Sequence, residues 1–146
     1  MTPVELDTMA RTVWAEARGE PLAGQIAVAW VILNRARDPG PDWWGDDIVS
    51  VCRRPWQFSC WNKGDPNRAR LLTLTLANRN FQVAQAACLL AASGHAPDPT
   101  GAATHYCTTA RPRWLAADKP WPPIWTMSMS ETITIGAHTF YKEMQT

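Results

Sequence analysis

The chain of 146 residues lacks a long apolar run, a strong net charge and a basic leader followed by an apolar segment. No apolar run approaches the roughly 20 residues that a helix needs to cross a bilayer. A net charge of +1 gives no electrostatic argument for a nucleic-acid partner or an acidic membrane surface. Because no secretory signal is visible, we expect synthesis in a cytoplasm and, for any export, another route.

Motifs for metal and cysteine chemistry are also missing. There is no His-Glu-x-x-His pattern and no close cysteine pair, which are the usual spacings of zinc sites. His105, Cys107 and His138 are legitimate zinc ligands but lack such a frame, so we expect neither a metal nor a cofactor. The cysteines at positions 52, 60, 88 and 107 are favoured as free or buried thiols. A bridge between Cys52 and Cys60 stays open for an oxidising compartment.

Glutamate is scarce, with five residues, and one of them has a position that suggests chemistry. Glu16 lies where an amphipathic helix ends, against unpaired carbonyls at the negative end of the helix dipole. That position disfavours the charged form and predicts a raised pKa. A carboxylic acid that stays protonated near neutral pH is what glycosidic bond cleavage requires.

Tryptophan, by contrast, is abundant: nine residues stand against three phenylalanines and two tyrosines. Indole rings are seldom fully buried and carry one N–H donor. The apolar faces of sugar rings stack on such rings, so the composition fits a saccharide cleft, although about half of the tryptophans are expected in the core.

The hydrophobic periodicity predicts a mainly helical (α+β) domain over residues 1–146. Thr2, Pro3 and Glu5 read as a capping box that starts the first helix, and Gly19 reads as the left-handed residue that ends it before Pro21. Further helices are expected at 22–37, 47–52, 65–76 and 81–93. Prolines exclude a long regular element at 111–123, and a hairpin is expected at 132–141.

Two loops carry candidate substrate-binding residues. In the loop at 54–62, Gln57 and Ser59 are suited to hold the N-acetyl and hydroxyl groups of a sugar. Phe58 and Trp61 either stack on the sugar or pack in the core.

The opposite wall of the cleft is expected at Thr104, His105 and Tyr106, where the tyrosine hydroxyl can orient the acid or an N-acetyl carbonyl. His105 is read equally as a structural histidine, and His138 and Tyr141 share that ambiguity. Period-two alternation places His138 on a different face of its strand from Tyr141.

Four stretches, taken in order, resemble the spore cortex-lytic (SleB/CwlJ-like) family of cell-wall hydrolases. They are Ala10-Arg11 with Ala15-Glu16-Ala17-Arg18-Gly19-Glu20-Pro21 and the run from Gly24 to Arg35; Gln57-Phe58-Ser59-Cys60-Trp61; Asp98-Pro99-Thr100-Gly101-Ala102 with Thr104-His105-Tyr106; and Ile135-Gly136-Ala137-His138-Thr139-Phe140-Tyr141. The resemblance implies a lysozyme-like, lytic-transglycosylase-like domain with a small C-terminal β-hairpin. It also implies peptidoglycan as substrate and Glu16 as catalytic acid.

Without an export signal or a separate wall-binding module, the chain looks more like the endolysin of a phage of Gram-negative hosts than like the spore enzymes. This resemblance implies a monomeric bacteriolytic enzyme that acts on periplasmic peptidoglycan, with a holin as the partner for its release.

The reaction type stays open between two routes. Glycoside cleavage normally uses two carboxylates. A lytic transglycosylase needs one, because the muramic acid C6 hydroxyl attacks C1 and leaves a 1,6-anhydro end. The single well-placed Glu16 favours this route over hydrolysis, in which Glu20 or a loop aspartate would position water. A peptidoglycan amidase that uses His and Cys, and a wall-binding module without catalysis, are the competing hypotheses.

Overall fold

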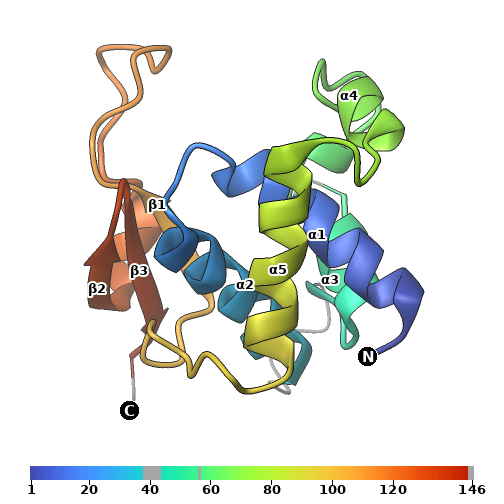
Figure 1. Ribbon diagram of the computed structural model, residues 1–146. Coiled ribbons are helices and arrows are strands. Elements are labelled where there is room, and N and C mark those ends of the chain that lie inside the picture. Colours follow the sequence, from blue (N-terminus) through green and yellow to red (C-terminus); the bar gives the residue numbers. More distant parts are fainter. Residues whose placement is uncertain (38–43, 56, 145–146) are drawn as a thin grey trace.

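The helices and the sheet form separate parts of the molecule (Figure 1). The computed structural model describes residues 1–37, 44–55 and 57–144. Its helical part consists of α1 (Pro3–Ala17), α2 (Leu22–Arg37), α3 (Ile48–Arg53), α4 (Arg68–Thr73) and α5 (Arg79–Ala92), with the 3₁₀ turn η2 (Ser59–Trp61) between α3 and α4. The sheet part consists of β1 (His105–Thr108), the 3₁₀ helix η3 (Ile124–Ser128), β2 (Met129–Ile135) and β3 (His138–Glu143). The predicted mainly helical fold class is confirmed.

The first helix begins as its sequence predicts but ends differently. Thr2 and Glu5 form the capping box, with bonds of 3.1 and 3.2 Å between each side chain and the other residue's backbone N–H. The expectation that Gly19 adopts a left-handed conformation is wrong, because it is not among the residues with positive φ. Arg18 stays helical, and the helix stops because Pro21 cannot extend it and restricts the residue before it.

The core lies between α1, α2 and α5. The second helix is buried over most of its length, as its apolar run predicts, and packs on both of the others. None of the helices within the described residues combines the length and the apolar character that crossing a bilayer requires. The fifth helix ends at Ala92 and is followed by Gly94 at φ +80°, the predicted stop.

The predicted helix at 65–76 is shorter than expected. Its observed part is α4, which starts after Asn67 and stops before the extended residue Leu74. Asp65 accepts the backbone N–H of Asn67 at 2.8 Å and so forms a turn ahead of the helix rather than its cap. The helix at 47–52 is confirmed as α3, with Asp47 as N-cap.

The predicted C-terminal hairpin is confirmed, and its strands are longer than predicted. A third strand, β1, pairs with it. The antiparallel order is β1-β3-β2, so β3 is the central strand, and four of its residues, 138–141, are buried. Between β1 and η3, residues 109–123 form a long connection without regular structure, which projects from the sheet (Figure 1). The prolines of this segment predict that outcome.

Candidate functional site

Glu16 lies in the last turn of α1 and keeps partial contact with solvent. Burial raises the pKa of this carboxyl, while a hydrogen bond from Tyr106 and the charge of Arg35 lower it. The nearby Asp65 charge raises the pKa again. The direction predicted from the sequence is confirmed, but the main cause is desolvation by the surrounding protein rather than the helix end.

Tyr106 approaches Glu16 from the sheet. Its ring lies 5.0 Å from that of His138 and 5.7 Å from that of Phe140, so these rings share one face of the sheet. Burial, followed by the Glu16 charge, raises the pKa of the Tyr106 hydroxyl well above its usual range. The hydroxyl therefore stays protonated and donates to Glu16.

Arg35 is the cation of the site, and sequence reasoning did not single it out. It is 8% exposed in the last turn of α2, and its Nε donates to the Thr104 carbonyl at 2.6 Å. Its guanidinium lies 5.7 Å from the ring of Trp44 and 5.5 Å from that of Phe58. The sequence signal for Arg35 was a charged residue in the last turn of a mostly apolar helix. Buried charges are seldom retained without a partner, so this arginine was a candidate for a site.

The charge of Asp65 raises the pKa of Glu16, whereas Glu20 makes its contacts with the C-terminal hairpin. The Glu20 Oε1 accepts the backbone N–H of Ala137 at 2.8 Å and lies 3.2 Å from Nδ1 of His138. Both side chains of the Glu20–His138 pair are about one-tenth exposed. Glu20 therefore joins the α1–α2 loop to the hairpin turn.

The predicted 54–62 loop contributes mostly structural contacts; residue 56 lies outside the described residues. Gln57 donates to the carbonyls of Val51 at 2.7 Å and Trp44 at 3.2 Å. Phe58 is buried beneath Arg35. Ser59, the next residue, is exposed and can contact a ligand. Trp61 is 9% exposed, and its indole N–H donates to the Thr12 hydroxyl at 2.9 Å.

His105 and Tyr141 lie on the face of the sheet opposite Tyr106. The His105 ring lies 5.3 Å from that of Trp125, and the Tyr141 ring lies 5.4 Å from the same indole. Burial and then the Arg35 charge lower the pKa of His105 to about 4, so the imidazole is neutral at pH 7. Neighbouring strand positions point to opposite faces, which separates His105 from the Glu16 carboxyl.

Thr104 precedes this strand and is buried. Its hydroxyl lies 3.0 Å from Nδ1 of His105, and its carbonyl holds Arg35. The predicted pairing of His138 with Phe140 on one face, with Tyr141 on the other, is confirmed by the ring contacts.

All four cysteines are buried and free. Burial raises the pKa of Cys52 and of Cys60 to about 12, and it also raises the pKa of Cys88 and Cys107. Thiolates are therefore scarce at neutral pH, which disfavours a cysteine nucleophile. Across the described part of the chain, no three His, Cys, Asp or Glu side chains gather as metal ligands.

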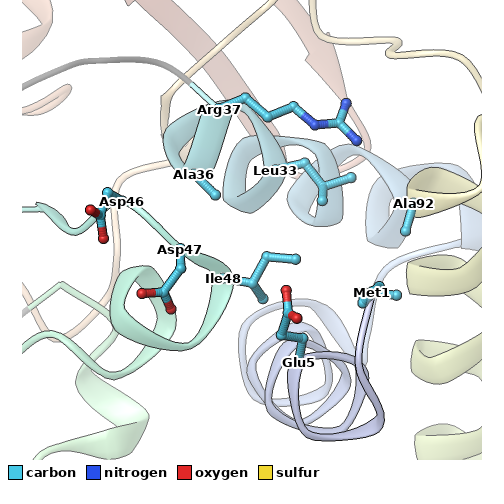
Figure 2. A pocket seen from close by; sticks show the side chains of 9 residues that line it. All are labelled: Met1, Glu5, Leu33, Ala36, Arg37, Asp46, Asp47, Ile48 and Ala92. Atoms are coloured by element: carbon cyan, nitrogen blue, oxygen red, sulfur yellow. The ribbon is translucent and has the colours of Figure 1, made fainter.

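A pocket of about 330 Å³ lies away from these residues, between the start of α1, the end of α2 and the start of α3. Figure 2 shows the carboxylates of Glu5, Asp46 and Asp47 around Ile48, with Arg37 across from them. Asp47 caps α3 and Glu5 caps α1, so two of these acids have structural partners. None of the predicted site residues lines this pocket.

Comparisons with known proteins show the family of the chain. The model of the Cell Wall Hydrolase family matches residues 19–141. The spore cortex-lytic enzyme of Halalkalibacterium halodurans is 34% identical over 113 residues, which cover 76% of this chain and 30% of the relative. That of Bacillus cereus is 32% identical over 144 residues, covering 94% and 44%. The chain thus spans less than half the length of these relatives.

Two solved structures share the fold. The catalytic domain of the Bacillus cereus SleB protein superposes with a TM-score of 0.69 at 30% identity, over 97% of this chain and 91% of that chain. The catalytic domain of the germination-specific lytic transglycosylase SleB from Bacillus anthracis gives 0.69 at 32% identity, over 97% of each chain. The family resemblance stated from the sequence motifs is confirmed.

Proposed function

Because the chain belongs to the Cell Wall Hydrolase family, we propose that it cleaves the glycan strands of peptidoglycan at the MurNAc-GlcNAc β-1,4 bond, with Glu16 as general acid. The observation that carries this proposal is the environment of Glu16, where burial favours the protonated form and Tyr106 fixes the carboxyl by a hydrogen bond. A positioned acid with a raised pKa is the group that protonates a leaving glycosidic oxygen.

The same surroundings suit the second half of the reaction. Once Glu16 has given its proton to the leaving oxygen, the carboxylate is stabilised by the Tyr106 hydroxyl and by the Arg35 charge. That carboxylate then accepts the proton of the muramic acid C6 hydroxyl. The C6 oxygen forms a bond to C1, which replaces the glycosidic bond that has broken. We infer a lytic transglycosylase that leaves 1,6-anhydro-MurNAc ends, since one carboxyl serves as acid and then as base.

Hydrolysis is the alternative, and Asp65 is the better candidate for its second carboxylate. The Asp65 charge acts on Glu16, whereas Glu20 is held by Ala137 and His138. Asp65→Asn keeps an oxygen that can accept the Asn67 N–H. We expect the variant to cleave within a few-fold of wild type, because transglycosylation needs no water-activating base. A loss of about 100-fold or more would favour hydrolysis.

Glu16→Gln on purified sacculi tests the central assignment. The amide keeps the size of the side chain and an acceptor for Tyr106, but it cannot donate a proton as an acid. We expect release of soluble glycan fragments to fall at least 100-fold, with an unchanged circular dichroism spectrum. Clearing of sacculi at near wild-type rate would overturn the proposal.

A further inference from the structure

A second pocket, of about 430 Å³, lies beside α4 at the end of the molecule where α1 finishes. Figure 1 shows α4 projecting on this side of the helical part. Its lining consists of Trp14, Arg70, Thr73, Leu74, Thr75, Ala77 and Asn78. The proposed reaction uses none of these residues.

Trp14, which lines this pocket, has an indole N–H that lacks an acceptor among the described residues. Trp14 is 2% exposed, and its Nε1 is buried without a hydrogen-bond partner among the described residues. The indoles of Trp30, Trp61 and Trp121 each donate to an oxygen at 2.9–3.0 Å. Buried donors without partners are rare because they lose their water and gain nothing. Because Trp14 lines the pocket, an acceptor bound there is the candidate partner for this donor.

Two cations flank the same ring. The guanidinium of Arg18 lies 4.2 Å from the Trp14 ring centroid and that of Arg70 lies 5.6 Å away. Neither arginine enters an ion pair within the described parts of the chain. Asn78 adds a donor, since its Oδ1 already accepts the N–H of Phe81 at 3.1 Å and its amide NH₂ remains. Trp14, Arg70 and Asn78 line the pocket, whereas Arg18 does not line it and adds its charge beside the same ring. An N–H, a guanidinium and an amide together suit a carboxylate.

The pocket is within reach of a substrate held at Glu16. Trp14 and Glu16 are two positions apart on α1, so their side chains leave the helix on nearly opposite sides with about 3 Å of rise between them. A helix with its side chains is about 10–12 Å across. Half the circumference of such a cylinder is about 16–19 Å, and five extended peptide residues span about 17 Å. A short peptide attached to the muramic acid at Glu16 can therefore pass round the end of α1.

We propose that the pocket lined by Trp14, Arg70 and Asn78 is a subsite for a carboxylate of the stem peptide carried by the strand being cleaved. The inference rests on the proposed cleavage of glycan strands. It makes the enzyme selective for strands that still bear their peptides.

Binding is tested on the full chain carrying Glu16→Gln, labelled with ¹⁵N. The probe is a synthetic L-Ala-D-Glu-diaminopimelate-D-Ala-D-Ala pentapeptide, compared with the same peptide in which every carboxylate is amidated. We expect the indole N–H signal of Trp14, assigned by its loss in Trp14→Phe, to shift with the acid and not with the amide. No shift at millimolar acid peptide would overturn the proposal.

Arg37→Gln is the matched control for Arg70→Gln. Arg37 also lies over an indole, 5.4 Å from that of Trp30, but this indole already donates to the Ala96 carbonyl. Removal of one charge-assisted contact should weaken binding about tenfold in Arg70→Gln. We expect wild-type affinity in Arg37→Gln. Equal effects of the two substitutions would contradict the assignment.

Cleavage assays separate this inference from the proposed function. On strands that bear stem peptides, Arg70→Gln should raise KM about tenfold, and on strands stripped of peptides by an amidase it should match wild type. An equal loss on both substrates, or no loss on either, would overturn the subsite. Persistent cleavage by Glu16→Gln would instead overturn the proposed function, whatever the peptide binds.

Discussion

At the scale of single residues, opposing influences act on the Glu16 carboxyl. Burial raises its pKa, and Asp65 adds to that rise, while the Tyr106 hydrogen bond and the Arg35 charge lower it. In the proposed reaction, this balance keeps the acid form available and leaves two groups in place to stabilise the carboxylate after proton transfer. A general acid works best when its pKa lies near the working pH.

Tyr106→Phe tests this balance. The hydrogen bond lowers the Glu16 pKa, so its removal should raise that pKa further and move the alkaline limb of the pH profile of kcat/KM to higher pH. Loss of the orienting bond should also reduce the maximal kcat/KM about tenfold. Dye release from labelled sacculi across pH 4–9 measures both, and an alkaline limb at unchanged or lower pH would contradict the account.

Glu16→Gln should have an effect on stability as well as on activity. A native carboxyl with a raised pKa binds protons more readily than the unfolded chain, so its contribution to stability falls as pH rises through that pKa. Replacement by a neutral amide removes this penalty at neutral pH. We expect a melting temperature a few degrees above wild type at pH 7, with the gain shrinking near pH 4, close to the usual glutamate pKa. A variant that melts well below wild type at pH 7 would contradict this view of the site.

Sequence reasoning singled out Glu16 and offered a contact between it and Tyr106, which the structure contains. It did not anticipate Arg35, the effect of Asp65 on the Glu16 pKa or the contact of Glu20 with the hairpin turn. Glu16 was singled out from a helix end and Tyr106 from a sequence motif, and both of these patterns are local. The others depend on contacts between residues far apart in the chain, such as Glu20 with Ala137, which no local pattern reports.

At the scale of elements, the hairpin is held against the α1–α2 loop by Glu20. Gly136 in the turn has φ +58°, and a Cβ placed there would lie 2.8 Å from Oε2 of Glu20. The close approach and the left-handed conformation both require glycine. This contact fixes β3 and with it His138, whose ring lies against Tyr106.

Gly136→Ala measures the strength of this contact. The added methyl should displace the Glu20 carboxylate and cost about 1–3 kcal/mol beyond the strain of a positive φ. Gly101→Ala is the control, since Gly101 has φ +65° but a Cβ there would have no atom nearer than 3.6 Å. We expect the excess cost of Gly136→Ala over Gly101→Ala to disappear in a Glu20→Ala background. Urea unfolding supplies the free energies, and an excess that persists would show that Glu20 is not the cause.

The helices and the hairpin were predictable because capping residues, apolar periodicity and turn residues act locally. Pairing of β1 with β3 was not, since it joins segments about 30 residues apart and has no signal of its own. The end of α1 was assigned to Gly19 on residue type alone, whereas Pro21 accounts for it.

At the scale of the whole molecule, the helical part and the sheet part meet at Glu16, and two of the four cysteines, Cys52 and Cys60, lie close enough for the Glu16 charge to act on them. All four are buried with raised pKa values, about 12 for Cys52 and Cys60. Iodoacetamide at pH 7.5 should therefore leave lysis of sacculi unchanged, because thiolates are scarce and inaccessible. Labelling of unfolded protein serves as the control. Rapid inactivation of the folded enzyme would instead support the amidase hypothesis, in which cysteine and histidine act together.

Mass spectrometry of the muropeptides released from purified sacculi tests the central claim most directly. If Glu16 acts as acid and then as base for the C6 hydroxyl, the new ends are 1,6-anhydro-muramic acid, lighter by one water than ordinary reducing ends, and they vanish in Glu16→Gln. Reducing ends alone would contradict the transglycosylase account and identify a water-using enzyme with a second carboxylate.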